Sequence, residues 1–127
     1  MEAIIIGQSG TATITVDHTN TAKTVGSGSL DVFATPMMIA LMEQAACDAI
    51  AKQLSDKETS VGTAVNIIHK AASVVGNTIT ATATVSEVDN RRIVFNIIAM
   101  DGIKEIGKGT HERFVVDIKR FTEKLGQ

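Results

Sequence analysis

Apolar and polar residues alternate along several segments of the chain, as they do in strands with one buried face. In residues 11–17, threonine at every second position alternates with Ala, Ile and Val, which predicts a strand. Residues 36–54 are instead rich in Ala, Leu, Met, Glu and Gln, which favours a helix. Thr35 suits the capping position of this helix, and Pro36 suits its first helical position. The first part of the chain thus predicts a strand followed by one long helix.

Beyond the helix the pattern predicts strands almost to the end of the chain. Alternating segments cover residues 61–69, 78–85 and 106–118, whereas residues 92–100 are apolar on both faces. A strand that is apolar on both faces is typical of the middle of a sheet. Gly-Asn, Asp-Asn and Asp-Gly pairs separate the segments and predict tight turns. Connections this short favour antiparallel neighbours.

These elements predict one α+β domain over residues 1–127. The long helix is too apolar for a surface helix, so we expect an antiparallel β-sheet wrapped around one central helix. Residues 117–125 are expected to form a short closing helix. The apolar content is high for the surface of a chain this small, which favours a homodimer or a larger homo-oligomer.

Composition excludes several classes of function. Hydrophobic residues make up 44% of the chain and charged residues 20%, which excludes a disordered protein. The net charge of -2 and the absence of Trp and Tyr argue against nucleic-acid binding. No apolar stretch is long enough to span a membrane, and no signal peptide is evident, so we expect a cytoplasmic protein. The scattered histidines give no metal-ligand spacing, and no metal or cofactor is expected.

Glu43 stands apart on the predicted helix. At about 100° per residue, Gln44, Asp48 and Lys52 form a polar stripe, and Glu43 lies about 140° from its centre. Its neighbours there are apolar, and among them Cys47 is expected to be a buried packing residue. A carboxylate on an apolar face is costly unless it is paired or protonated, and such groups often serve functional sites. The structural alternative is that Glu43 pairs with a buried Arg or caps a backbone N–H.

His69 is the second unusual residue, since it lies on a strand face that should be buried. That face is shared by Val61, Thr63, Val65 and Ile67. Taken alone, such a histidine is more often a hydrogen-bonded core residue than a catalyst. Thr35, Glu43 and His69 together nevertheless form a plausible hydrolytic set. Glu43 lies about 12 Å along the helix from Thr35, so the two are expected to share a cleft rather than a hydrogen bond.

Short motifs along residues 31–121 resemble one known family. In order they are Val-Phe-Ala-Thr at 32–35, Met38, Glu43, Gly-Thr-Ala at 62–64, His69, Ala-Ala at 71–72, Asp-Gly at 101–102, Glu-Ile-Gly at 105–107, and Gly-Thr-His-Glu-Arg at 109–113. They resemble the fluoroacetyl-CoA thioesterase-like family of hotdog-fold thioesterases. The resemblance implies a hotdog fold and an acyl-CoA thioesterase that acts on a small acyl thioester.

The resemblance also implies roles for individual residues. The family's catalytic Thr, Glu and His fall on Thr35, Glu43 and His69, and its glycine beside the substrate carbonyl falls on Gly62. Glu43 would act as nucleophile or general base, His69 would transfer protons to assist departure of the thiolate, and Thr35 would orient a reacting group. Arg113 is a candidate for binding a phosphate of CoA, with a surface pair to Glu112 or Asp117 as the alternative.

The chain departs from the family at two places. Pro36 replaces the glycine after the threonine and has no N–H to offer to an oxyanion. Residues 24–30, where the family's fluoroacetyl-CoA enzyme has an aromatic lid, contain no aromatic residue. We therefore expect a thioesterase that is not selective for fluoroacetyl-CoA. A non-catalytic acyl-CoA binding module and a hotdog-fold hydratase or dehydratase remain alternatives. The acyl chain, and CoA or an acyl-carrier protein as the thiol, are left open.

Overall fold

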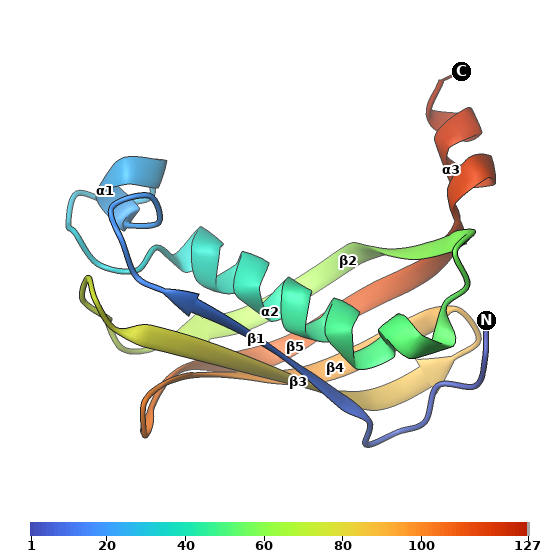
Figure 1. Cartoon of the computed structure of the whole chain (residues 1–127), viewed down its shortest axis with the longest axis horizontal. Helices are drawn as coiled ribbons and strands as arrows, with labels where there is room; N and C mark the ends of the chain where they lie inside the picture. Colours follow the sequence, from blue (N-terminus) through green and yellow to red (C-terminus); the bar gives the residue numbers. More distant parts are fainter. Residues whose placement is uncertain (127) are drawn as a thin grey trace.

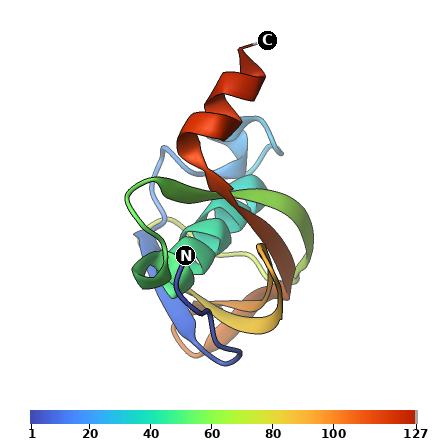
Figure 2. The ribbon, with the colours of Figure 1, turned by 90° about the vertical axis from the view of Figure 1, so that its right-hand side faces the viewer.

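The structure, a computed structural model, describes residues 1–126. Its elements are β1 (Ser9–Thr15), α1 (Ala22–Val25), α2 (Thr35–Ile50), the 3-10 helix η1 (Ala51–Gln53), β2 (Glu58–His69), β3 (Thr78–Asp89), β4 (Arg92–Asp101), β5 (Lys104–Asp117) and α3 (Ile118–Leu125). The sheet curls around α2, as Figures 1 and 2 show. The α+β fold with a sheet wrapped around one central helix is therefore confirmed.

The sheet has the order β1-β3-β4-β5-β2, and all of its strand pairs are antiparallel. The apolar strand β4 is the central one, as its sequence predicts. Asn90 and Gly102 are the first residues of the tight turns before and after β4, and their φ angles are 57° and 60°. β1 begins and ends two residues before the predicted strand.

The core lies between α2 and the β1, β3 and β4 half of the sheet. Buried α2 residues are Met38, Leu41, Met42, Ala45, Ala46, Ala49 and Ile50. They meet alternating buried residues on the strands, namely Ile79, Ala81, Ala83, Val85, Ile93, Phe95, Ile97 and Ala99. Many of these side chains are small, so backbones approach closely. At Gly10 an added Cβ would lie 2.2 Å from the backbone nitrogen of Ala49.

The start of α2 differs from the sequence prediction. Ala34 is the capping residue and makes no side-chain cap, whereas Thr35 is the first helical residue. The expected capping role of Thr35 is therefore wrong, and Pro36 is the second helical residue rather than the first. The helix also ends at Ile50, before η1. Cys47 is exposed, so the prediction that it is buried is wrong as well. The α2 face that carries Cys47 turns away from β1 and β3, which cover the other side of the helix.

A β-bulge in β2 divides that strand into two parts. Gly62 pairs with Arg113 and Ala64 pairs with Glu112, so Thr63 is the extra residue between them. Because of the bulge, even-numbered residues before Thr63 and odd-numbered residues after it face the same side of the sheet. Val61 therefore lies opposite Phe114 on the outer face, and Thr63 bonds to Glu112 there. The prediction that these two residues share the face of His69 is wrong.

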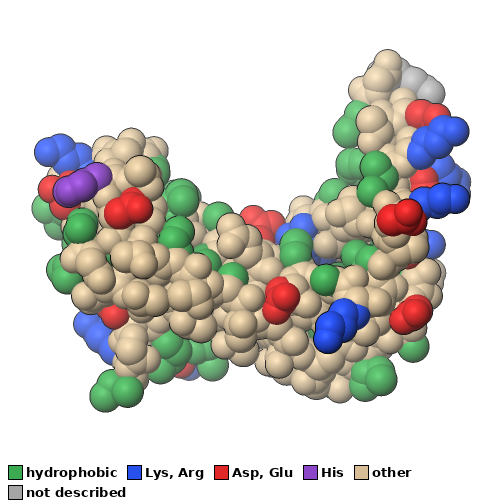
Figure 3. All heavy atoms as spheres, viewed as in Figure 1, with side chains coloured by type: hydrophobic (Ala, Val, Ile, Leu, Met, Phe, Trp, Pro, Cys, Tyr) green, Lys and Arg blue, Asp and Glu red, His purple; other side chains and the backbone are tan. Residues whose placement is uncertain are grey.

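The closing helix α3 projects from the body of the molecule (Figures 1 and 2). Asp117 caps it by accepting a hydrogen bond from the backbone N–H of Arg120. Figure 3 shows a hollow between the end that carries α1 and the projecting α3, and apolar side chains lie on the side of α3 that faces the hollow. Within residues 1–126, no helix is long and apolar enough to cross a membrane.

Candidate active site

Thr35 and His69 come together where the first turn of α2 meets the end of β2. The Thr35 Oγ1 atom lies 2.8 Å from Nδ1 of His69, which is a hydrogen bond. Thr35 does not cap α2, because its side chain points to β2 rather than to the backbone of its own helix. The pair therefore joins a hydroxyl and an imidazole at a helix N-terminus, where partial positive charge favours a developing anion.

The other ring nitrogen of His69, Nε2, has no hydrogen-bond partner among residues 1–126. This nitrogen is buried. Burial is also the main cause that lowers the pKa of His69 below its ordinary value of 6.5, and the nearby backbone of Ala71 offsets part of this effect. The ring is therefore neutral at pH 7. A neutral imidazole with one engaged and one unengaged nitrogen can give or take a proton from a bound molecule.

A pocket of about 280 Å³ opens beside this pair. Its lining residues are Ala22, Ser27, Val32, Phe33, Thr35, His69, Lys70, Ala71 and Ala72. Most of them are small or apolar, apart from Lys70, which forms an ion pair with Glu105 at the rim. The pocket can hold a small, largely apolar group with its reactive end at the Thr35–His69 pair.

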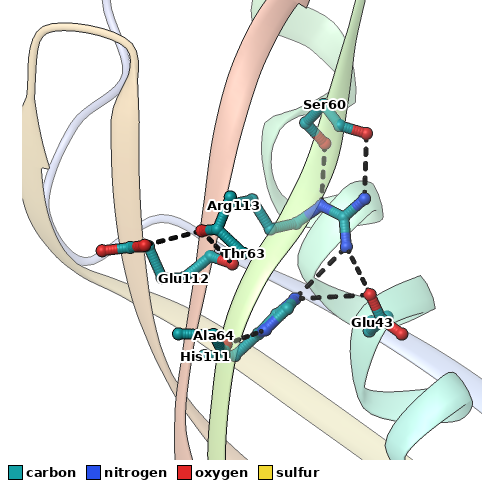
Figure 4. A network of polar contacts seen from close by, with 7 residues as sticks. All are labelled: Glu43, Ser60, Thr63, Ala64, His111, Glu112 and Arg113. Carbon is teal, nitrogen blue, oxygen red and sulfur yellow. Dashed lines mark hydrogen bonds and ion pairs between the residues drawn. The ribbon is translucent and has the colours of Figure 1, made fainter. Parts of the chain in front are cut away.

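Glu43 lies in a second cluster farther along α2 (Figure 4). Its Oε2 atom accepts a hydrogen bond of 2.9 Å from Nη1 of Arg113 and lies 3.9 Å from Nε2 of His111. The other carboxylate oxygen points away from Arg113 in Figure 4, and the Glu43 side chain is 39% exposed. One oxygen is thus anchored, while the carboxylate still reaches solvent.

Arg113 is buried and held from several sides. Its Nε donates to Oγ of Ser60 at 2.8 Å, and its Nη2 donates to the carbonyl of the same residue at 2.9 Å. Gly62 lies directly against this cluster, since a Cβ added there would be 2.5 Å from Oε2 of Glu43. The lack of a side chain at Gly62 makes room for the carboxylate. Within residues 1–126, no group of three or more His, Cys, Asp or Glu side chains is arranged to hold a metal.

Comparison with known proteins identifies the family. Residues 16–119 match the family of fluoroacetyl-CoA-specific thioesterases. A fluoroacetyl-CoA thioesterase of Streptantibioticus cattleyicolor is 44% identical over 97 residues, which cover 76% of this chain and 70% of that protein. The chain belongs to this family. The thioester hydrolase expected from the sequence is thereby confirmed.

Solved structures agree with this assignment. The structure of the fluoroacetyl-CoA thioesterase FlK superposes with a TM-score of 0.92 at 36% identity, covering 99% of this chain and 98% of that one. A hot-dog-like protein from Thermanaerovibrio acidaminovorans superposes with a TM-score of 0.84 at 23% identity, covering 94% and 89% of the two chains. The second similarity concerns the fold alone, and together they confirm the hotdog fold.

The residues expected at the site of this thioesterase fall into two groups. Thr35 and His69 form one, and Glu43 and Gly62 form the other. Among residues 1–126, no hydrogen bond joins Glu43 to either member of the first group. Its partner is the buried Arg113, so the structural alternative considered for Glu43 is what the geometry shows.

Arg113 itself faces inward rather than forming the surface pair considered from the sequence. Glu112 instead bonds to Arg92 and Thr63 on the outer face. A contact between Arg113 and a phosphate of CoA stays a prediction, and it would have to form around a guanidinium that Ser60, Glu43 and His111 already hold.

His111 is a site residue that the sequence reasoning did not single out. His111 and Arg113 are two residues apart on β5, so their side chains lie on the same face of the strand, and this face contacts Glu43. This two-residue spacing was the feature of the sequence that could have placed His111 beside Arg113.

Proposed function

We propose that the protein hydrolyses a small acyl-CoA thioester with Thr35, Glu43 and His69. The observation that carries the proposal is the Thr35–His69 hydrogen bond at the mouth of a pocket of about 280 Å³, with Nε2 of His69 unpartnered within residues 1–126. Family membership adds support, because a variant of FlK has been solved with acetyl-CoA bound.

The chemistry divides between the two groups of residues. A water molecule, or the unanchored oxygen of Glu43, attacks the thioester carbonyl carbon, and the oxygen of that carbonyl becomes negatively charged. When Glu43 acts as general base it takes the proton of the attacking water. The carbon–sulfur bond then breaks, and the departing thiolate takes a proton from His69, while the proton that the water lost to Glu43 passes back to the ring. When Glu43 is the nucleophile, a water molecule afterwards hydrolyses the resulting anhydride, which frees the carboxylate and supplies that proton. Thr35 holds the imidazole in the orientation that this transfer needs.

The two groups lie too far apart to act on one carbonyl within a single chain. Glu43 follows Thr35 by about 12 Å of helical rise along α2, and Arg113 anchors one oxygen of its carboxylate. The proposal therefore includes a homodimer in which one copy supplies Glu43 and the other supplies the Thr35–His69 pair. The edge strand β2 supports this arrangement, because Val65 and Ile68 on it are 42% and 62% exposed. A second copy on this edge would cover them.

The proposal further states that fluoroacetyl-CoA is not preferred over acetyl-CoA. Residues 24–30 contribute only the small Ser27 to the pocket, and the apolar lining consists of three alanines together with Val32 and Phe33. A pocket wall of this kind gives little contact that distinguishes fluorine from hydrogen. Comparable kcat/KM values for the two thioesters are expected, and a strong preference for fluoroacetyl-CoA would contradict this part.

The experiment follows release of free thiol from a panel of short, medium and aryl acyl-CoAs. Glu43→Gln is expected to lower kcat at least about 100-fold, since it removes the general base or nucleophile. Glu123→Gln, on the projecting α3, is the matched control and should retain wild-type rates. Near-full activity of Glu43→Gln would refute the assignment. Bound acyl-CoA without thiol release would indicate a binding module instead.

Mixing two inactive variants tests the dimer. Glu43→Gln and His69→Ala, each inactive alone, are expected to recover activity when their subunits are allowed to exchange. Random exchange of equal amounts makes about half of the dimers mixed, and one of the two sites in each mixed dimer has both intact groups, so about one quarter of all sites recover. Mixed dimers that form but stay inactive would show that both groups must come from one chain.

A further inference from the structure

His111 is buried beside Glu43, and the mechanism above does not use it. The residue is 2% exposed, and its ring stacks on Phe95 with centroids 6.1 Å apart and an interplanar angle of 27°. Stacking fixes the plane of the imidazole and leaves its two nitrogens pointing in set directions. The imidazole is therefore more rigidly oriented than a residue that only fills space in the core needs to be.

The contact at Nδ1 determines where the ring proton lies. Nδ1 of His111 is 2.8 Å from the carbonyl oxygen of Ala64 in β2. A carbonyl oxygen accepts hydrogen bonds and cannot donate one, so Nδ1 carries the proton. In the neutral ring Nε2 is then an acceptor. Two residues further along β5, Nη1 of Arg113 lies 3.2 Å from this Nε2 and donates to it.

Arg113 is thereby oriented on all sides. Ser60 accepts from Nε and Nη2, and the two protons on Nη1 are directed at His111 and Glu43 (Figure 4). Because the guanidinium is planar, an acceptor for one Nη1 proton sets the direction of the other. The neutral imidazole of His111 therefore helps to aim the proton that anchors Oε2 of Glu43.

We propose that His111, as the neutral Nδ1–H tautomer, is a positioning residue that acts through Arg113 to hold the Glu43 carboxylate for thioester hydrolysis. This role rests on the function proposed above. It predicts that protonation of His111 lowers activity through the loss of its hydrogen bond with Arg113. With both ring nitrogens protonated, Nε2 would direct a proton at the Arg113 guanidinium and the hydrogen bond between them would be lost.

The charges around His111 set the direction of this pH effect. Arg113 on β5 opposes protonation, whereas Glu43 on α2 and Glu112 on β5 favour it, and Phe95 on β4 is uncharged. Burial lowers the pKa of His111 below its ordinary value of 6.5, and it outweighs these charges as well as the hydrogen bond to the backbone of Ala64, which favours protonation. The neutral ring therefore holds Arg113 at pH 7, and the arrangement is lost as the pH falls below the ordinary range of histidine.

Two substitutions separate the donor and acceptor functions of the ring. His111→Asn keeps an N–H near the position of Nδ1 but offers no acceptor to Arg113. His111→Gln is longer, and its carbonyl can accept from Arg113 without titrating. We expect kcat of His111→Asn to fall about tenfold with KM changed less than about twofold, the loss typical of one hydrogen bond to a charged group. His111→Gln should fall less, and its acidic inflection in kcat should move to lower pH.

Measurements on the wild type and a control complete the test. His18→Asn, which changes an exposed histidine in the loop between β1 and α1, should keep the wild-type rate and pH profile. Nitrogen-15 NMR should show Nε2 of His111 unprotonated at neutral pH. Protonated Nε2, or wild-type kcat and pH profile in His111→Asn, would overturn the positioning role. Equal losses in the Asn and Gln variants would do the same. Absence of thioester hydrolysis by the wild type would instead refute the proposed function.

Discussion

Replacing Gly62 with alanine tests whether the glycine makes room for the Glu43 carboxylate. The added Cβ would lie 2.5 Å from Oε2 of Glu43, and 3.3 Å from both Nη1 of Arg113 and Cε1 of His111. Ordinary contact begins near 3.4 Å, so the carboxylate has to retreat by about 1 Å. Glu43 can do so because its flexible side chain is 39% exposed. The substitution therefore displaces a reacting group without opening or crowding the core.

The expected losses in activity and stability differ sharply. Misplacement of a reacting group by about 1 Å costs about 100-fold in rate, and we expect kcat to fall by that factor. Weakening the ion pair with Arg113 costs about 1 to 2 kcal/mol, because Glu43 exchanges one partner for water. Alanine offsets about 0.4 to 1 kcal/mol of this by restricting the unfolded chain. The net change is about 1 kcal/mol, or a fall of about 4 °C in Tm.

Thiol-release kinetics and thermal unfolding of the same preparation provide the check. Gly126→Ala is the matched control, because a Cβ there meets only the carbonyl of Glu123 at 3.6 Å. It should change neither kcat nor Tm measurably. A Gly62→Ala variant with kcat within about threefold of the wild type would refute the reasoning, since that is far from the effect of a 1 Å displacement. A Tm lowered by more than about 10 °C would show that Gly62 serves the fold instead.

Two further predictions concern stability. Gly10→Ala should lower the free energy of unfolding by about 3 kcal/mol, because its Cβ would collide with the backbone of α2 at Ala49, and calorimetry showing an unchanged Tm would contradict this. Burial lowers the pKa of both His69 and His111, so the unfolded chain binds protons below pH 6.5 that the folded chain does not. The stability of the wild type in urea should therefore fall from about pH 7.5 to about pH 5.5, whereas a flat profile would show that the rings titrate normally.

Alternation and turn residues predict the main elements, but the Gly-Asn pair does not join antiparallel neighbours, because β2 and β3 are not adjacent in the sheet. The apolar run of β4 identified the central strand, and the Asp-Asn and Asp-Gly pairs marked the turns on either side of it. These are local properties of the chain, and a residue pattern reports them directly. The long helix was predicted for the same reason, although its end was placed four residues too late.

Properties that depend on neighbouring elements were not accessible in this way. Cys47 was expected to be buried because its helix neighbours are apolar, but α2 is covered mainly by β1 and β3 and its other side stays open. Thr35 was expected to cap α2, whereas its hydroxyl bonds to His69 across a tertiary contact. The sequence allowed for pairing of Glu43 with a buried Arg. Which Arg this is depends on how β5 packs against α2, and the structure shows that it is Arg113.

The bulge at Thr63 has a consequence for how this site can change over generations. Gly62 and His69 are seven positions apart, an odd number, yet both face α2 because one residue between them is unpaired. Loss of a single residue anywhere between the two would erase the bulge or turn one of them to the outer face. Lineages that retain both groups are therefore expected to vary in this stretch by substitution and to reject single-residue insertions and deletions.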